Sequence, residues 1–123
     1  MTSEQIKKKL DLDRIGDFSE NRARVLKNNK YGHVDLNGKV VVPIIYDYAS
    51  SFQEGRTWVE KNGKEGHVDK NGKVTTPIIY DYVGNFKEGR AWVEIRNFEF
   101  YINLNGIPVK HKDYYKLIKG IFK

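Results

Sequence analysis

The chain has no cysteine, and it contains no long apolar run. The absence of cysteine excludes disulfide bonds, thiolate metal sites and a cysteine nucleophile. A membrane-spanning helix needs about 20 consecutive apolar residues, and no segment approaches that length. The first residues also lack the apolar stretch of a secretory signal behind their charges. We therefore expect a cytoplasmic protein of one domain over residues 1–123, since a chain of this length buries roughly two-thirds of its unfolded surface.

What the sequence does contain is an internal repeat with a spacing of 34 residues. Residues 31–60 and 65–94 are identical at 21 of 30 positions. Such a period is typical of arrays in which neighbouring units stack and share a core. Partial copies of the pattern extend it in both directions. We expect about three units over residues 13–107, a helical lead over residues 1–12 and a diverged, basic C-terminal cap over residues 108–123.

The turn-forming residues inside each unit are spaced as in antiparallel strands. Asn-Gly dipeptides, which tolerate the positive φ angles of tight turns, separate stretches rich in Val, Ile, Tyr and Trp. Pro43 and Pro77 lack the amide hydrogen that a central strand needs, so we expect them at a strand end or at a sheet edge. The sequence therefore predicts a mainly all-β fold, in which antiparallel β-meander and hairpin repeats of 34 residues form a small array with a short N-terminal helix.

Hairpin parity predicts which side chains share a face. If Asn62 and Gly63 form a two-residue turn, Val59 faces Gly66 on one side of the hairpin. The other side then carries the pairs Arg22–Asp35, Arg24–His33, Arg56–Asp69, Trp58–His67, Arg90–Asn103 and Trp92–Tyr101 over the three units. The first side is small and apolar in every unit, and we expect it to be core. We expect the second, the polar hairpin face, to be an outer or semi-exposed surface.

These units resemble the bacterial WG repeats. A unit of that family looks like four segments in order: a Gly-aromatic-Ile/Val-Asp strand, an Asn/Thr-Gly-Lys turn, a Pro-x-x-Tyr-Asp segment and a Phe-x-Glu-Gly-x-Ala-x-Val strand. The matching runs here are residues 32–35, 37–39, 43–47 and 52–59, with copies 34 residues later. The chain departs from the family pattern because Tyr31, Glu65 and Glu99 replace the Trp of the namesake Trp-Gly dipeptide. Tryptophan lies instead on the other hairpin strand, at Trp58 and Trp92. The resemblance implies a repeat fold and a role in interaction rather than catalysis.

The polar hairpin face is the surface that we expect to bind another protein. Trp, Tyr and Arg are common at binding hot spots because they offer large rigid contact areas or forked donors. The candidate binding residues are Arg22, Arg24, His33, Arg56, Trp58, His67, Arg90, Trp92 and Tyr101. The alternative is that these side chains serve the array itself, with arginines paired to aspartates across the strands and tryptophans packed on tyrosines. Both interpretations stay open.

Two histidines at the repeat spacing raise the question of a metal site. His33 and His67 are each followed two residues later by an aspartate, and two histidines with two carboxylates suit zinc or iron. The arginines proposed as partners compete for those aspartates, so we expect no metal and no cofactor. A phosphate-binding glycine loop and a nucleophile elbow are both missing. Asp47 and Asp81 are expected to accept backbone hydrogen bonds in bends. We expect no enzyme and no small-molecule substrate.

The formal net charge of +6 is concentrated at the two ends of the chain. Residues 1–30 carry +3, residues 31–109 carry −1 and residues 110–123 carry +4. The last segment interleaves lysines with aromatic residues, as single-strand nucleic-acid binders do. Its candidate contacts are Lys110, Lys112, Tyr114, Tyr115, Lys116 and Lys119. The same segment also suits a cap over the apolar face that the last unit would otherwise expose.

The sequence thus favours a non-catalytic protein-binding module, acting as an adaptor or as an inhibitor that occludes a partner's surface. Nucleic-acid or nucleoprotein binding through the basic ends is the alternative, and a metal-binding protein or enzyme ranks third. The expected partner is another protein, including one within a nucleoprotein complex, and not a membrane. We expect a monomer or a weak homo-oligomer.

Overall fold

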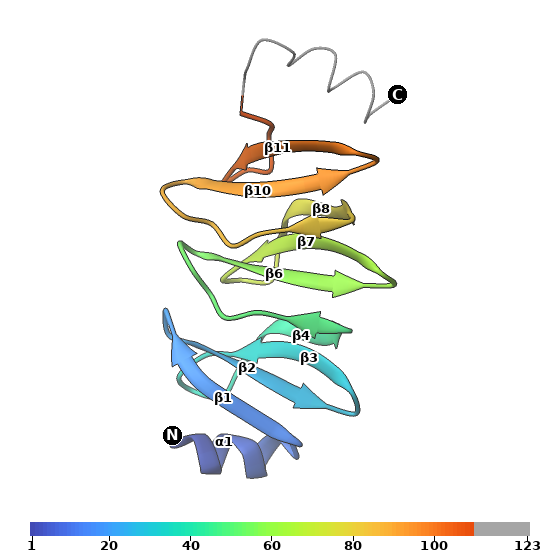
Figure 1. Cartoon of the computed structure of the whole chain (residues 1–123). Helices are drawn as coiled ribbons and strands as arrows, with labels where there is room; N and C mark the ends of the chain where they lie inside the picture. Colours follow the sequence, from blue (N-terminus) through green and yellow to red (C-terminus); the bar gives the residue numbers. More distant parts are fainter. Residues whose placement is uncertain (110–123) are drawn as a thin grey trace.

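The computed structural model describes residues 1–109 as a stack of antiparallel β-units that follow one another in sequence order. Figure 1 shows the helix α1 at one end of the stack and the hairpin of β10 and β11 toward the other. The elements are α1 (Ser3–Leu10), β1 (Arg14–Ser19), β2 (Arg22–Lys27), β3 (Lys30–Val34), β4 (Val40–Tyr46), β5 (Tyr48–Ala49), β6 (Arg56–Lys61), β7 (Lys64–Asp69), β8 (Val74–Tyr80), β9 (Tyr82–Val83), β10 (Arg90–Ile95) and β11 (Phe98–Asn103). The predicted all-β repeat array with a short N-terminal helix is confirmed.

Over the described residues the strands form three antiparallel sheets, in the orders β1-β2-β3-β4, β5-β6-β7-β8 and β9-β10-β11. We call these sheets the first, second and third units. The central hairpin of each unit closes on a two-residue turn in which both residues have positive φ, as in a type I′ turn. The turn residues are Asn28 and Asn29, Asn62 and Gly63, and Arg96 and Asn97.

The predicted hairpin register is confirmed in all three units. Val59 lies opposite Gly66 and Trp58 opposite His67, and the first and third hairpins pair in the same way. The small apolar side of each hairpin is buried, as expected. Its core members are Ala23, Val25 and Val34 in the first unit, Val59 and Val68 in the second, and Ala91, Val93 and Ile102 in the third.

A glycine lets a fourth strand pass close over the hairpin in the first two units. A Cβ placed on Gly66 would lie 2.5 Å from the carbonyl oxygen of Thr76 in β8, and one placed on Gly32 would lie equally close to β4. Both crossing strands lie at the edge of their sheets, which accommodates Pro43 and Pro77 as predicted. The equivalent position in the third unit is Phe100, whose buried ring helps to fill the core there.

Neighbouring units share apolar clusters. Val42 and Tyr46 from β4 pack with Val59 and Val68 of the second unit, so the end of one unit helps to build the core of the next. At the start of the stack, Ile6 of α1 is buried in the cluster of the first unit. Within residues 1–109, no helix has the length and apolar character needed to cross a membrane.

Candidate protein-binding surface

The polar hairpin face does not run along the molecule as one exposed stripe. In the first and second units, the loop and turn of the following unit cover much of it. We call the contact between the first and second units the first junction, and that between the second and third units the second junction. The third unit carries the same polar face on its own hairpin, formed by β10 and β11.

The two histidines lie inside the junctions, so the expectation that they are semi-exposed is wrong. His33 is 0% exposed and His67 is 1% exposed. Their Nε2 atoms lie 2.8 Å from the carbonyl oxygens of Ser50 and Gly84, so Nε2 carries the proton and donates it. Parity assigned both side chains to the correct face, but the following loop covers that face. Neither histidine can touch a binding partner.

Each imidazole also packs against a phenylalanine of the following unit. The ring centres of His33 and Phe52 lie 4.7 Å apart, and those of His67 and Phe86 lie 4.6 Å apart. The pKa of both histidines is lowered to about 4, mainly by burial and to a smaller extent by nearby arginine charges, while the hydrogen bond to the backbone carbonyl opposes this shift. Both side chains are therefore neutral at pH 7.

The two junctions differ at one atom. Nδ1 of His67 lies 3.0 Å from the hydroxyl oxygen of Thr76, which donates to it. The residue opposite His33 is Val42, and Nδ1 of His33 is buried with no hydrogen-bond partner among the described residues. One methyl in place of a hydroxyl thus leaves a buried acceptor unsatisfied in the first junction only.

The arginines of the first two units link each unit to the next. Nε of Arg22 donates to the carbonyl oxygen of Lys70 at 2.9 Å, and Nε of Arg56 donates to that of Leu104 at 3.0 Å. Both acceptors lie just before an Asn-Gly turn. These guanidinium groups therefore belong to the junctions rather than to a free surface.

The predicted arginine–aspartate ion pairs are not formed among residues 1–109. Arg56 lies opposite Asp69 in the register, as predicted, but the Asp69 carboxylate accepts the backbone N–H groups of Asn71 and Lys73 at 2.9 and 3.0 Å. The carboxylate closes its own turn, while the guanidinium reaches the following unit. Local backbone donors thus take the place of the arginine.

A second link between units was missed at the sequence level. The Glu20 carboxylate accepts the backbone N–H of Gly55 at 2.7 Å, and the Glu54 carboxylate accepts that of Gly89 at the same distance. A signal for it existed, because glutamate recurs at 20, 54 and 88 with the repeat spacing. That recurrence does not reveal that the acceptor and the donor lie in different units.

Arg24 and Trp58 flank a small aromatic group between the first and second units. A guanidinium nitrogen of Arg24 donates to the Tyr48 hydroxyl at 2.8 Å, and the ring centres of Tyr48 and Trp58 lie 5.0 Å apart. The Tyr31 ring also packs on Tyr48, with ring centres 5.2 Å apart. For these two candidate residues, the alternative interpretation of aromatic packing within the array has direct structural support.

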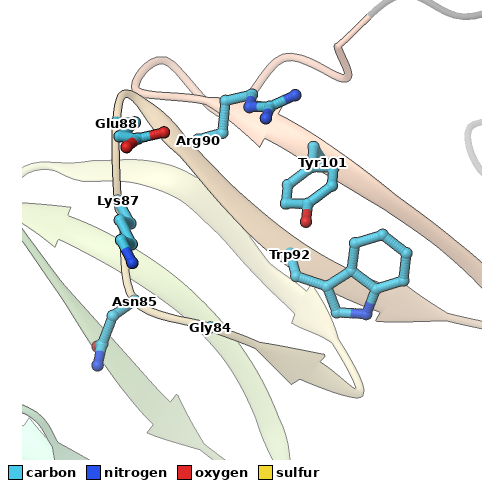
Figure 2. A pocket seen from close by; sticks show the side chains of 7 residues that line it. All are labelled: Gly84, Asn85, Lys87, Glu88, Arg90, Trp92 and Tyr101. Atoms are coloured by element: carbon cyan, nitrogen blue, oxygen red, sulfur yellow. The ribbon is translucent and has the colours of Figure 1, made fainter.

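The third unit leaves its copy of the polar face open. Arg90 is exposed and Tyr101 is 42% exposed. Figure 2 shows the Tyr101 ring between the side chains of Arg90 and Trp92, with the chain from Gly84 to Glu88 alongside. The guanidinium carbon lies 4.6 Å from the centre of the Tyr101 ring, and the Trp92 ring centre lies 5.0 Å from it. The hollow they form measures about 300 Å³.

We call this surface the end face, and it comprises the residues that line the hollow: Gly84, Asn85, Lys87, Glu88, Arg90, Trp92 and Tyr101. In the part of the chain that the structure describes, the Arg90 guanidinium donates to no carbonyl and the Glu88 carboxylate accepts no amide. Both groups have such partners at the equivalent positions in the second unit. Three of the nine candidate binding residues, Arg90, Trp92 and Tyr101, therefore meet in one open surface.

The two aspartates of the repeated Tyr-Asp-Tyr runs accept hydrogen bonds from the backbone. The carboxylates of Asp47 and Asp81 accept backbone N–H groups, as predicted, but the donors are Asn62 and Arg96 in the hairpin turn 15 residues later and not residues of the bend itself. Each carboxylate also pairs with a lysine. Hydrogen bonding to the lysines is the largest cause of the lowered pKa of both aspartates. Across residues 1–109, no three His, Cys, Asp or Glu side chains are grouped to hold a metal ion.

The candidate nucleic-acid contacts lie outside the described residues. They are Lys110, Lys112, Tyr114, Tyr115, Lys116 and Lys119, within the segment expected to form the C-terminal cap.

Comparison with known families identifies the repeat. The model of the WG containing repeat family matches residues 3–31, 31–64 and 66–97. No curated protein and no solved structure matches the chain.

Proposed function

The chain belongs to the WG-repeat family, and we propose that it is a non-catalytic protein-binding module whose contact surface is the end face. The family and the repeated β-fold are consistent with a protein-interaction module. One observation supports this surface in particular. Equivalent side chains in the first two units are used in junctions, whereas Arg90, Trp92 and Tyr101 remain open together.

The chemistry of the end face suits a protein partner. A Trp, a Tyr and an Arg in one patch are the residue types that contribute most to protein-binding energy. The Arg90 guanidinium is held over the Tyr101 ring before any partner arrives, so less conformational entropy is lost on binding. The charged side chains of Lys87 and Glu88 border the aromatic centre, as polar rims do in protein interfaces.

The position of the end face favours an adaptor or an inhibitor. It lies on the third unit and shares with the second junction only Gly84, whose carbonyl oxygen accepts from His67. A partner therefore binds without opening a core. We propose that the module covers part of the partner's surface and either blocks it or joins it to another protein.

The test is affinity capture of the tagged full chain from a lysate of its native host, with identification by mass spectrometry. We expect a protein partner that is retained by the wild type and by Trp58→Ala, and lost by Trp92→Ala combined with Arg90→Ala. Trp58→Ala is the matched control because it removes the same ring from a junction. Circular dichroism of each variant checks that it is folded.

Half of each lysate is treated with nuclease before capture. Partners that disappear with nuclease and persist with the end-face variant would transfer the function to nucleic-acid or nucleoprotein binding. The next residues to replace would then be Lys110, Lys112, Lys116 and Lys119.

A further inference from the structure

The two junctions show what kind of segment the polar hairpin face receives within this chain. In each junction, a glutamate accepts the backbone N–H of a glycine in the next unit's loop. A histidine donates to a carbonyl of the same loop and packs on its phenylalanine. The loop therefore presents a carbonyl, a Phe ring and a glycine amide in fixed order. In the first junction these come from Ser50, Phe52 and Gly55.

The end face repeats the receiving groups. Glu88 and Arg90 occupy the positions of Glu54 and Arg56, and Tyr101 occupies the position of His67. A tyrosine hydroxyl donates a hydrogen bond as the Nε2–H of histidine does, and its ring offers a flat surface to a phenylalanine. Among residues 1–109, no loop is docked on these three side chains.

From this equivalence we propose that the end face binds a β-hairpin of another protein whose loop carries the sequence Phe-x-Glu-Gly, the same kind of loop that closes both internal junctions. The inference rests on the proposed function and names the class of partner. Glu88 accepts the glycine amide of that loop, and Tyr101 donates to its carbonyl and packs on its Phe. Arg90 donates to a carbonyl of an adjacent turn, as Arg56 does to Leu104.

A second copy of this chain is the less suitable occupant, because α1 already covers the first unit. Gly72 and Gly106 dock closely on the preceding unit, where an added Cβ would lie 2.4 Å from the carbonyl oxygens of Val41 and Thr75. The equivalent glycine of the first unit, Gly38, faces Ile6 of α1 instead. The helix thus takes the place of a preceding unit, and head-to-tail stacking of two copies would have to displace it.

The probe for this proposal is a hairpin peptide with the sequence of residues 48–60. The ends of this segment pair in the fold, with Tyr48 opposite Glu60, so a disulfide between cysteines added at its two termini closes the hairpin. The peptide is titrated into the ¹⁵N-labelled full chain and followed by two-dimensional NMR. We expect chemical-shift changes at Glu88, Arg90 and Tyr101 and at the Trp92 indole.

Variants on both sides test the chemistry. A peptide carrying Phe52→Ala should not bind, and Glu88→Gln in the protein should weaken binding about 10-fold, because a neutral acceptor replaces a charged one. The matched control is Glu20→Gln, whose carboxylate is already occupied by Gly55 in the first junction. It should leave the peptide affinity unchanged.

Three results would overturn the proposal. The first is an absence of shifts at millimolar peptide, and the second is a set of shifts away from the end face. In the third, the peptide shifts the resonances of residues 110–123, which would mean that the chain's own C-terminal segment occupies the face. Failure of the peptide alongside a lysate partner lost in the Trp92→Ala and Arg90→Ala variant leaves the protein-binding function standing. Peptide binding without any such lysate partner would support the proposed chemistry of the end face and would leave the proposed protein-binding function without support.

Discussion

Arg56 and Arg90 occupy the same position in consecutive units, yet they have different partners. Arg56 reaches the carbonyl oxygen of Leu104 in the third unit, whereas Arg90 lies over the Tyr101 ring and reaches no carbonyl among residues 1–109. The same holds for Glu54, which accepts an amide, and Glu88, which accepts none there. The comparison teaches that in a stacked array the neighbouring unit decides whether a repeated side chain is structural or available for binding.

The third unit also differs inside. Its hairpin carries Phe100 and Tyr101 where the second unit carries Gly66 and His67. Gly66 leaves space for the backbone of β8, whereas the Phe100 ring is buried in the apolar cluster of the third unit. The hairpin of the second unit is thus crossed closely by a backbone strand, and the hairpin of the third unit is packed with a side chain at the equivalent position.

The largest expected difference between the junctions and the end face is a loss of stability at acidic pH, which should affect the junctions. The pKa of His33 and His67 is lowered to about 4 in the fold, against 6.5 for an ordinary histidine. The unfolded chain therefore takes up protons first, so stability is fully present above pH 6.5 and is lost as the pH falls toward 4. The expected loss is roughly 3 kcal/mol for each histidine.

Urea unfolding at pH 7, 5.5 and 4 measures that loss, and NMR of the imidazole Cε1–H signals assigns it to each side chain. Hydrogen exchange should show the junctions opening before the third hairpin, which carries Tyr101 in place of a histidine. A folded-state titration of either buried imidazole near pH 6.5 would contradict the structure.

A Cβ at Gly66 should break the second unit. Gly66→Ala places a methyl 2.5 Å from the Thr76 carbonyl oxygen, where backbone must move, and we expect a loss of about 3 kcal/mol. Gly84→Ala is the control, because its nearest contact outside its chain neighbours would be an ordinary 3.6 Å. Urea midpoints of the two variants give the comparison, and equal midpoints would refute the close crossing of β8.

The arginine comparison can be measured directly. Arg56→Ala removes a hydrogen bond from a charged donor across the second junction, and we expect a loss of about 1.5 kcal/mol. Arg90→Ala should change the free energy of unfolding by less than about 0.5 kcal/mol, as exposed substitutions usually do. Thermal and urea unfolding report both values. A loss at Arg90 as large as that at Arg56 would mean that this guanidinium is also structural.

The smallest expected effect concerns the single-atom difference between the junctions. Val42→Thr should supply the hydroxyl that Nδ1 of His33 lacks and stabilise the fold by about 1 kcal/mol, while Thr76→Val should remove the equivalent bond from His67 and cost about as much. The double variant, with both changes, should unfold near the wild-type midpoint. Two changes of the same sign would show that the hydroxyl does not act through the imidazole.

The fold was accessible from sequence because its determinants are local. A two-residue turn with period-two alternation specifies that Trp58 lies opposite His67, and an approximate 34-residue copy specifies that the other hairpins match. The candidate site was accessible only in part. Arg90, Trp92 and Tyr101 were named, but so were His33 and His67, which are buried. A periodic pattern assigns a side chain to a face and does not tell what covers that face.

Sequence alone therefore specified the repeat, the strand register, the apolar side of each hairpin and the family, because each depends on residues within one unit. The tertiary structure decided which copies of the polar face are covered. His33 meets Ser50 and Arg22 meets Lys70 only once the units stack, across 17 and 48 positions of the chain. Stacking turns chemically similar side chains into junction contacts in two units and leaves them open in the third, since the end face is what remains when no further unit is docked among residues 1–109.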